Sequence, residues 1–382
     1  MPKFLEARIR AAVQGGAGPL GLDAVTTTLL AVGLYGSWRD LQEAAAYWAG
    51  GWLGGRLGLR RALLLFSSLP LVGYALLLLW ASPWAAFVAL PFVTVYDAIS
   101  SPAALTVVNT TLHERQRTLG IALQSLQRRV PRVLAYLGGG ALVAGLGAVG
   151  GVQAGLFISA PLVVLALLVQ WRFLSAAARD TPRDPAGLGL VRRFDPRLKR
   201  LLVCDALARV AEGMPRELFV LWVVALPALG GEETGALRFG QLLALQSVVA
   251  LLTYLPIGLI TARGGAREPW IAASFLCFAL FPAAAWLLGT RLGLPGLALA
   301  WVLGGLRELG EPARKSLITD LVPPEARTTA VGVYWAVRCL LTAPMPLLGA
   351  LLWLWDPAAP FMVASAVGLV GALGFALFCR AR

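Results

Sequence analysis

The sequence predicts an all-α integral membrane protein with 12 transmembrane helices in two pseudo-symmetric six-helix bundles. Three observations support this prediction. Hydrophobic residues make up 58% of the 382 residues and only 14% are charged, whereas soluble domains have about 25% charged residues. Apolar stretches of the length needed to cross a bilayer recur along the chain. The two halves also carry similar short sequences at a nearly constant offset, which indicates an internal repeat.

A stretch of about 20 mostly apolar residues is long enough to span the hydrocarbon core. Six such stretches precede a charged interval, at 12–35, 39–55, 62–81, 83–108, 118–141 and 151–172. Six more follow it, at 199–226, 238–261, 269–288, 292–313, 328–351 and 359–379. The interval contains Pro, Gly and several charges, as linkers do. We therefore expect an N-terminal bundle over 1–174, a cytoplasmic linker over 175–197 and a C-terminal bundle over 198–382.

The distribution of basic residues predicts the orientation in the membrane, because cytoplasmic loops collect Lys and Arg. With the N-terminus placed inside, the cytoplasmic loops and the linker hold most of the loop arginines, among them Arg56, Arg60, Arg61, Arg115, Arg117, Arg192, Arg193, Arg197, Arg263, Arg267 and Arg327. The opposite side keeps Arg39, Arg291 and, at the edge of a span, Arg238. This asymmetry predicts cytoplasmic N- and C-termini.

The formal net charge of +13 does not indicate a nucleic-acid partner. Its basic residues punctuate apolar stretches instead of forming one solvated basic face. Four cysteines, at 204, 277, 339 and 379, lie in apolar segments, and the single histidine, His113, is isolated. Neither a metal site nor a disulfide framework is therefore expected. No phosphate-binding loop is present, so we expect no cofactor and no ATP-driven step.

The internal repeat is clearest after the second span of each half. The sequence GWLGGRLGLR begins at Gly51, and GLITARGGAR begins at Gly258. Four positions coincide at an offset of 207, namely Gly51/Gly258, Arg56/Arg263, Gly58/Gly265 and Arg60/Arg267. A second pair, SPAAL from Ser101 and EPARK from Glu311, coincides at an offset of 210. Parallel six-helix repeats are an architecture of secondary transporters.

On these residues the chain resembles the major facilitator superfamily (MFS) of secondary transporters, in its bacterial type. The signature of the family between its second and third helices matches at the four repeated Gly and Arg positions of each copy. The signature carboxylate is absent, since Gly55 and Ala262 stand in its place. The stretch from Leu306 to Gly332 is also similar to the tenth-to-eleventh helix region of bacterial members. The resemblance implies a monomeric multi-pass protein of the cell inner membrane that works by alternating access.

The resemblance also implies that Arg56, Arg60, Arg263 and Arg267 belong to a cytoplasmic gate. The glycines of the motif allow a tight turn and a close approach of helices. The alternative interpretation is that the arginines only anchor the cytoplasmic side. Pro102 and Pro312, late in the fourth and tenth spans, either permit bending of the helices or mark static kinks.

Several ionisable residues lie within predicted spans, where each costs at least about 2.5–3.5 kcal/mol near the centre. Asp23 is expected about 16 Å into the first span, close to the midplane. Asp205, Arg209, Glu212 and Arg216 recur at steps of four, three and four residues, which places them on one helix face. These positions favour a polar pathway over a purely lipid-facing surface.

From these positions we predict a substrate and proton pathway and a gate. The pathway candidates are Asp23, Asp97, Arg128, Arg209, Glu212 and Arg338, with Asp23 and Glu212 as proton-coupling carboxylates. The arginines among them would hold an anionic group of the substrate. Arg307, Glu308 and Glu311 are predicted to complete the cytoplasmic gate. The alternative is static ion pairing, for example of Arg209 with Asp205 or Glu212.

The predicted function is secondary active transport of a small solute, either an organic anion, a zwitterion or a drug-like compound, coupled to protons. Its partners would be the solute, protons and the lipid bilayer. A flippase for lipids or lysolipids on the same scaffold is the first alternative, and would have a cavity open sideways to the bilayer. A membrane-embedded enzyme or a sensor is the second. The sequence contains no activated nucleophile, metal cluster or carboxylate-rich diphosphate motif that an enzyme would need.

Overall fold

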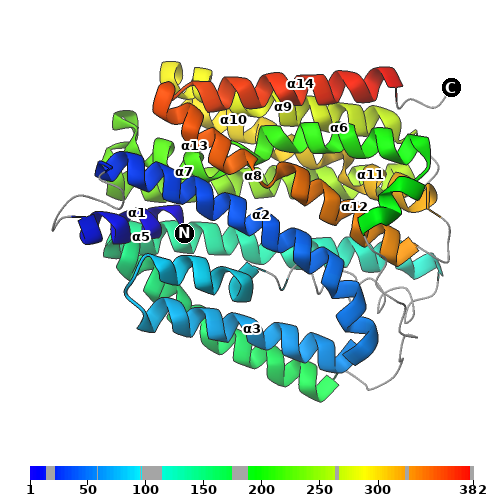
Figure 1. Cartoon of the computed structure of the whole chain (residues 1–382), viewed down its shortest axis with the longest axis horizontal. Coiled ribbons are helices and arrows are strands. Elements are labelled where there is room, and N and C mark those ends of the chain that lie inside the picture. The colour runs from blue at the N-terminus through cyan, green and yellow to red at the C-terminus, as the bar shows by residue number, and fades with distance from the viewer. Residues whose placement is uncertain are drawn as a thin grey trace.

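The computed structural model describes residues 1–13, 22–57, 59–94, 96, 114–173, 188–262, 266–322 and 327–378. Side chains at some helical positions, among them 50–57 and 114–128, lie outside this description. Throughout these ranges the secondary structure is helical, without strands. Helices lie side by side and run roughly along the long axis of the molecule (Figure 1).

The second half follows the predicted spans closely. Its helices are α6 (Pro196–Gly213), α7 (Arg216–Ala225), α8 (Gly231–Ala262), α9 (Glu268–Leu292), α10 (Leu294–Leu306), α11 (Glu311–Asp320), α12 (Arg327–Thr342), α13 (Met345–Trp355) and α14 (Ala359–Phe378). Three of the six spans are broken. Pro215 separates α6 from α7, the 3-10 turn η4 (Arg307–Gly310) separates α10 from α11, and Pro344 precedes α13. At η4, side chains use the main chain: the hydroxyl of Ser274 donates to the carbonyl of Arg307, and Arg307 Nε donates to the carbonyl of Gly304.

The first half contains α1 (Pro2–Val13), α2 (Ala24–Leu57), α3 (Leu59–Leu79), a helix over Trp84–Thr94 and α5 (Glu114–Phe173). The long α5 reverses at Gly147, whose φ of 72° lies in the left-handed region that glycine tolerates. A Cβ on Gly151 would lie 2.6 Å from the main chain of Leu142 and Val143, so the two arms of α5 fold back on each other. This confirms the predicted spans 118–141 and 151–172. The predicted span 83–108 is described only in its first part.

The first two predicted spans, 12–35 and 39–55, were wrong. A single helix, α2, covers the second half of the first span and all of the second, and α1 is a separate short helix. The prediction placed Arg39 in an external loop because charges interrupt the apolar pattern there. In the structure Arg39 and Asp40 lie inside α2 and pair with charges of α7. The start of the chain packs among Tyr35 and Leu218, so it lies partway along the molecule and not at the end where α14 finishes (Figure 1).

The repeat appears in the helices themselves. Adding the offset of 207 to Ala24, the first residue of α2, gives Gly231, the first residue of α8. Adding the same offset to the residue numbers of α3 gives a range that nearly coincides with α9. In both halves the helix before the Gly/Arg motif therefore has the same start and nearly the same length, as expected for a duplicated unit.

The two halves meet along two sets of helices, with α2 packed on α12 and α13, and α5 packed on α8. Glycines allow the close approach. A Cβ on Gly33 would lie 2.6 Å from the Cβ of Ala350, and a Cβ on Gly240 would lie 2.5 Å from the carbonyl oxygen of Tyr136. Small residues at such crossings are typical of helices that associate in membranes.

Many large apolar side chains point outward, among them Phe157, Leu162, Leu252, Leu299 and Leu373, each at least 60% exposed. Five stretches of the described chain are long and apolar enough to cross a membrane: Arg129–Phe173, Thr234–Ile260, Glu268–Leu292, Ala330–Trp355 and Ala359–Phe378. Such a surface suits lipid. We name the end of the molecule that holds the α7–α8 connection the α7–α8 end (left in Figure 1), and the opposite end the α8–α9 end.

Candidate functional site

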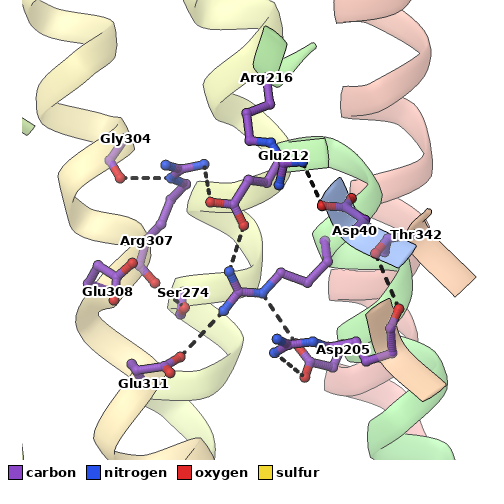
Figure 2. Close-up of polar contacts among 12 residues, drawn as sticks. Asp40, Asp205, Glu212, Arg216, Ser274, Gly304, Arg307, Glu308, Glu311 and Thr342 are labelled. Carbon is purple, nitrogen blue, oxygen red and sulfur yellow. Dashed lines mark hydrogen bonds and ion pairs between the residues drawn. The ribbon is translucent and has the colours of Figure 1, made fainter. Parts of the chain in front are cut away.

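The charged residues of the predicted seventh span lie on two helices. Asp205, Arg209 and Glu212 project from one face of α6, at the spacing that the sequence predicted. Pro215 then stands between α6 and α7, and Arg216 begins α7. The break separates their partners, since the α6 charges face the second half and Arg216 reaches α2 of the first half (Figure 2).

Asp205 is the centre of the α6 contacts and is completely buried. Its Oδ1 accepts a 2.6 Å hydrogen bond from Nη1 of Arg314, and its Oδ2 accepts one of 3.1 Å from the hydroxyl of Tyr334. Arg338 Nη1 lies 3.5 Å from Oδ2, and Arg209 Nε lies 3.8 Å from Oδ1. A buried carboxylate is stable only when cations and hydrogen bonds surround it in this way. Asp205 thereby joins α6, α11 and α12.

Glu212 connects α6 to the 3-10 turn η4. Arg209 Nη1 donates to Glu212 Oε2 at 2.6 Å, and Arg307 Nη1 lies 3.7 Å from Glu212 Oε1 (Figure 2). Arg307 Nε also donates to the carbonyl of Gly304 at 2.8 Å. The guanidinium carbons of Arg209 and Arg307 lie 4.6 and 5.0 Å from the ring centre of Phe278, a cation–π arrangement that helps to hold both.

Glu311 completes the cluster. It pairs with Arg314, with Lys315 Nζ at 3.2 Å and with Arg209 Nη2 at 3.5 Å. We define the charge network as Asp205, Arg209, Glu212, Arg307, Glu311, Arg314, Lys315 and Arg338. It holds five cations and three carboxylates, so two positive charges are unbalanced within it. Lys315 is 42% exposed, so solvent screens one of them, and the other belongs to the buried part.

Ion pairs also cross between the two halves. Arg216 Nη2 donates to Asp40 Oδ1 at 2.6 Å, and Arg39 Nη1 donates to Glu217 Oε1 at 3.2 Å. Two adjacent oppositely charged residues of α2 thus face two of α7.

A third pair crosses farther around the interface. Arg129 of α5 donates to Glu308 of η4 at 3.0 Å, and its guanidinium carbon lies 5.0 Å from the ring centre of Tyr254. We call these three contacts, Arg216–Asp40, Arg39–Glu217 and Arg129–Glu308, the interface pairs.

Among the predicted pathway residues, the structure brings Arg209, Glu212 and Arg338 together in the charge network. Asp97 lies outside the described residues, and the side chain of Arg128 does too, although its backbone belongs to α5. The predicted gate residues Arg307 and Glu311 belong to the same network as the pathway residues. Glu308 joins it indirectly, by tying its turn to Arg129.

Asp23 does not have the predicted depth within a helix. It is exposed and precedes α2, where its Oδ2 accepts hydrogen bonds of 3.1 Å from the backbone N–H groups of Val25 and Thr26. Hydrogen bonds from Thr26 lower the pKa of Asp23 from its usual value. Capping therefore favours the charged carboxylate, which is the opposite of what proton loading near neutral pH needs. The predicted depth was wrong because the helix begins at Ala24, not at residue 12.

Two arginines of the repeated motif, Arg60 and Arg267, make contacts away from the charge network. Arg60 Nη2 donates to the carbonyl of Trp171 at 2.7 Å, and Arg267 pairs with Asp320. Both contacts tie neighbouring helices within one half. Arg263 and the side chain of Arg56 lie outside the described residues.

Sequence reasoning missed Asp40, Glu217 and Tyr334 and misplaced Arg39. The signal that could have found the interface pairs was the juxtaposition of two charged doublets, Arg39-Asp40 and Arg216-Glu217, in two apolar regions. No group of three or more metal-ligating side chains occurs among the described residues.

Comparison with known proteins identifies the fold. No protein-family model matches the chain, and no curated protein matches it. A crystal structure of a POT family transporter in complex with 5-aminolevulinic acid is 15% identical, with a TM-score of 0.71 over 99% of this chain and 93% of that one. The xylose transporter XylE from E. coli, in a partially occluded inward-open conformation, is 11% identical, with a TM-score of 0.70 over 99% and 94%.

The human organic anion transporter MFSD10 is 18% identical, with a TM-score of 0.66 over 98% of this chain and 93% of that one. Matches of this length and quality with three transporters of different solutes confirm the fold predicted from the repeated motif. The chain has the fold of the major facilitator transporters.

Proposed function

We propose that the protein is a secondary active transporter of a small organic anion or zwitterion, coupled to protons and working by alternating access of its two halves. The observation that carries this proposal is the buried charge network beside an interface held by ion pairs. Buried ion pairs add little to stability compared with well-packed apolar residues. Ionisable groups among membrane helices accordingly mark solute or proton pathways.

The unbalanced positive charge of the charge network supports an anionic group on the solute. A carboxylate bound near Arg338 and Arg209 would balance it with charge-assisted hydrogen bonds. The similar structures include POT transporters in complex with 5-aminolevulinic acid and with alafosfalin, and MFSD10 is an organic anion transporter. These names supply probes to test, because the likeness itself extends only to the fold.

Glu212 is our candidate for proton coupling, because it shares Arg209 with the other carboxylates of the network. When a solute carboxylate takes over Arg209, Glu212 loses its shortest ion pair and keeps only the 3.7 Å contact with Arg307. A partly buried carboxylate that is paired more weakly binds a proton more readily. When the solute leaves, Arg209 returns to Glu212 and the proton is released. Solute and proton therefore move together.

The interface pairs support a gating role for contacts between the halves. Rocking of one half against the other would separate Arg216 from Asp40 and Arg129 from Glu308, whereas the contacts around Asp205 lie within the second half and would persist. Arg307, Glu308 and Glu311 would form the gate on the side of the second half, and the Gly/Arg motifs around Arg56, Arg60, Arg263 and Arg267 would serve the cytoplasmic ends.

We further propose a cell inner membrane location with the α8–α9 end in the cytoplasm. Arg60, Arg61 and Arg267 lie at that end, as does the basic segment that starts α6. Such a bias toward one side is the usual sign of a cytoplasmic face. A monomer with bundles over 1–174 and 198–382, joined by a cytoplasmic linker over 175–197, completes the proposal.

Reconstitution into proteoliposomes tests the function. Internal pH and solute uptake are followed while an inward proton gradient is imposed, with 5-aminolevulinic acid and a dipeptide as charged probes and xylose as the neutral control. We expect uptake of a charged probe together with acidification inside. If the uptake of every carboxylate probe is independent of the proton gradient, the proposal is contradicted. Transbilayer movement of a labelled lysolipid, without uptake of a solute, would favour the flippase.

A further inference from the structure

A cavity separate from the charge network lies where α1 and α2 of the first half meet α7 and α13 of the second. Its volume is about 410 Å³, within the range of roughly 300–1,000 Å³ that is usual for small-molecule sites. The side chains that matter here are Glu6, Arg10, Thr28, Leu29, Leu221 and Trp353. Because both halves line it, any ligand in the cavity would touch both.

The hydroxyl of Thr28 supplies the first sign of a ligand. Thr28 is only 6% exposed, lines the cavity, and its Oγ1 has no hydrogen-bond partner within the described part of the chain. A buried hydroxyl without a partner destabilises the folded state, so such groups call for an explanation. A polar ligand atom in the cavity would satisfy it. The buried Oγ1 of Thr27 likewise has no hydrogen-bond partner among the residues that the structure describes, but Thr27 does not line the cavity.

The charges at the cavity favour an anionic ligand. The carboxylate of Glu6 is already paired twice, with Lys3 Nζ at 2.8 Å and with Arg10 Nη2 at 2.5 Å. The side chain of Arg10 is 55% exposed, and its guanidinium carries five N–H donors, more than the pairing with Glu6 requires. The nearby Asp23 is directed to the N-terminus of α2 and does not line the cavity.

The remaining lining is apolar. Leu29, Leu221 and Trp353 come from three different helices, and Trp353 packs edge-on against Trp286, with ring centres 6.4 Å apart, which fixes its position. An apolar lining with few polar groups is the usual composition of a specific small-molecule site.

We propose that this cavity binds a small amphipathic carboxylate. Its apolar body lies against Leu29, Leu221 and Trp353, and its carboxylate accepts hydrogen bonds from Arg10 and Thr28. Since the ligand contacts both halves, it stabilises the arrangement of the halves seen in this structure over any arrangement in which they separate here. The site is distinct from the charge network and does not depend on the identity of a transported solute.

Calorimetric titration of the full chain in lipid nanodiscs with 4-phenylbutyrate tests this proposal, with 4-phenylbutanamide as the uncharged analogue. We expect the carboxylate to bind at least about tenfold more tightly than the amide, as charge-assisted hydrogen bonds predict. Arg10→Gln should remove about the same factor. Ala24→Phe, which fills the cavity from the first turn of α2, should abolish binding while size-exclusion and circular dichroism profiles stay unchanged.

Thr28→Val and Thr27→Val form a matched pair. Each removes a buried hydroxyl without a partner, so each should raise the melting temperature of the ligand-free protein. Only Thr28→Val should lower the affinity for 4-phenylbutyrate, by about fivefold. Equal binding of the amide, unchanged affinity in Arg10→Gln, or an equal change of 4-phenylbutyrate affinity in the two threonine variants would overturn the proposal.

A last arm identifies the source of the carboxylate. Oleate added to the nanodisc at low mole fraction should displace 4-phenylbutyrate if membrane fatty acids reach the site. If it does not, while the other results hold, the site takes water-soluble carboxylates. Either result is compatible with the proposed chemistry, and loss of the carboxylate preference would contradict it in both cases.

Discussion

The contacts around Asp205 and the interface pairs are both made of buried or partly buried ions, but they are built differently. Asp205 has four partners on three helices of one half, and it is fully buried. Each interface pair instead joins one cation of one half to a carboxylate of the other. A hub with several partners cannot open without leaving a buried charge. Arg216 and Arg39 of the interface pairs, in contrast, also contact Glu217 and Glu43 of their own helices, so they keep a carboxylate partner as the halves move. This difference separates a structural centre from contacts suited to a gate.

The largest effect is expected at the hub. Asp205→Asn removes the charge that balances Arg314 and Arg338, and breaking a buried ion network in this way costs about 3–5 kcal/mol. We expect a strongly lowered melting temperature in detergent, or failure to fold. The control is Asp320→Asn, whose carboxylate is exposed and pairs only with Arg267 among the described residues. A similar melting temperature for both variants would contradict the central role of Asp205.

The next effect concerns coupling. Glu212→Gln keeps the shape of the side chain but cannot carry a proton between Arg209 and Arg307. We expect the protein to fold, to exchange solute across liposomes at equal pH, and to lose proton-driven accumulation at least tenfold. Glu268→Gln, at the start of α9, is the control and should accumulate solute normally. Unchanged accumulation in Glu212→Gln would move proton coupling to another group.

The interface pairs should show smaller, coupled effects. Asp40→Asn and Arg216→Gln each break the same 2.6 Å contact, so their effects on stability should not add. A double-mutant cycle on unfolding in detergent should give a coupling free energy of about 0.5–3 kcal/mol. The matched cycle of Asp40→Asn with Arg129→Gln joins residues of different pairs and should give a value near zero. Equal coupling free energies in both cycles would contradict the claim that Arg216–Asp40 and Arg129–Glu308 act as independent contacts.

The smallest effect on stability is expected from the close helix crossings, although transport should respond. Gly240→Ala places a methyl group against the carbonyl of Tyr136 on α5. Overpacking of this kind costs about 1–3 kcal/mol, partly relieved if the halves shift. We expect slower transport with a modestly lower melting temperature. Gly139→Ala is the control, since a Cβ there meets nothing within 4 Å, and it should behave like the unaltered protein.

The sequence predicted the second half well because its spans are apolar between clear breaks, and the period of α6 placed Asp205, Arg209 and Glu212 on one face. It failed at α2 because Arg39 and Asp40 look like a loop until their partners on α7 are known. Those partners are about 177 residues away in the chain, so the sequence pattern around Arg39 and Asp40 does not indicate the pairing. The same holds for Tyr334, which became a site residue only when α12 packed beside α6.

The outcome for Asp23 shows a second limit. The depth assigned to a charge depends on where its helix starts. The helix starts 12 residues later than predicted, so Asp23 caps the helix and does not lie at its centre. The grouping of Asp205, Arg209 and Glu212 was less sensitive to such an error, because it depends on their spacing within α6 and not on where the helix starts.

The most direct test measures distances across the interface. In a cysteine-free background, Val25→Cys with Trp355→Cys reports the α7–α8 end, and Arg61→Cys with Arg200→Cys reports the α8–α9 end; all four side chains are exposed. Spin-label distances are recorded with and without a transported solute at high and low pH. The account predicts that one end opens as the other closes, with opposite changes in the two distances. Distances at both ends that stay fixed under every condition, in a protein that still transports, would contradict it.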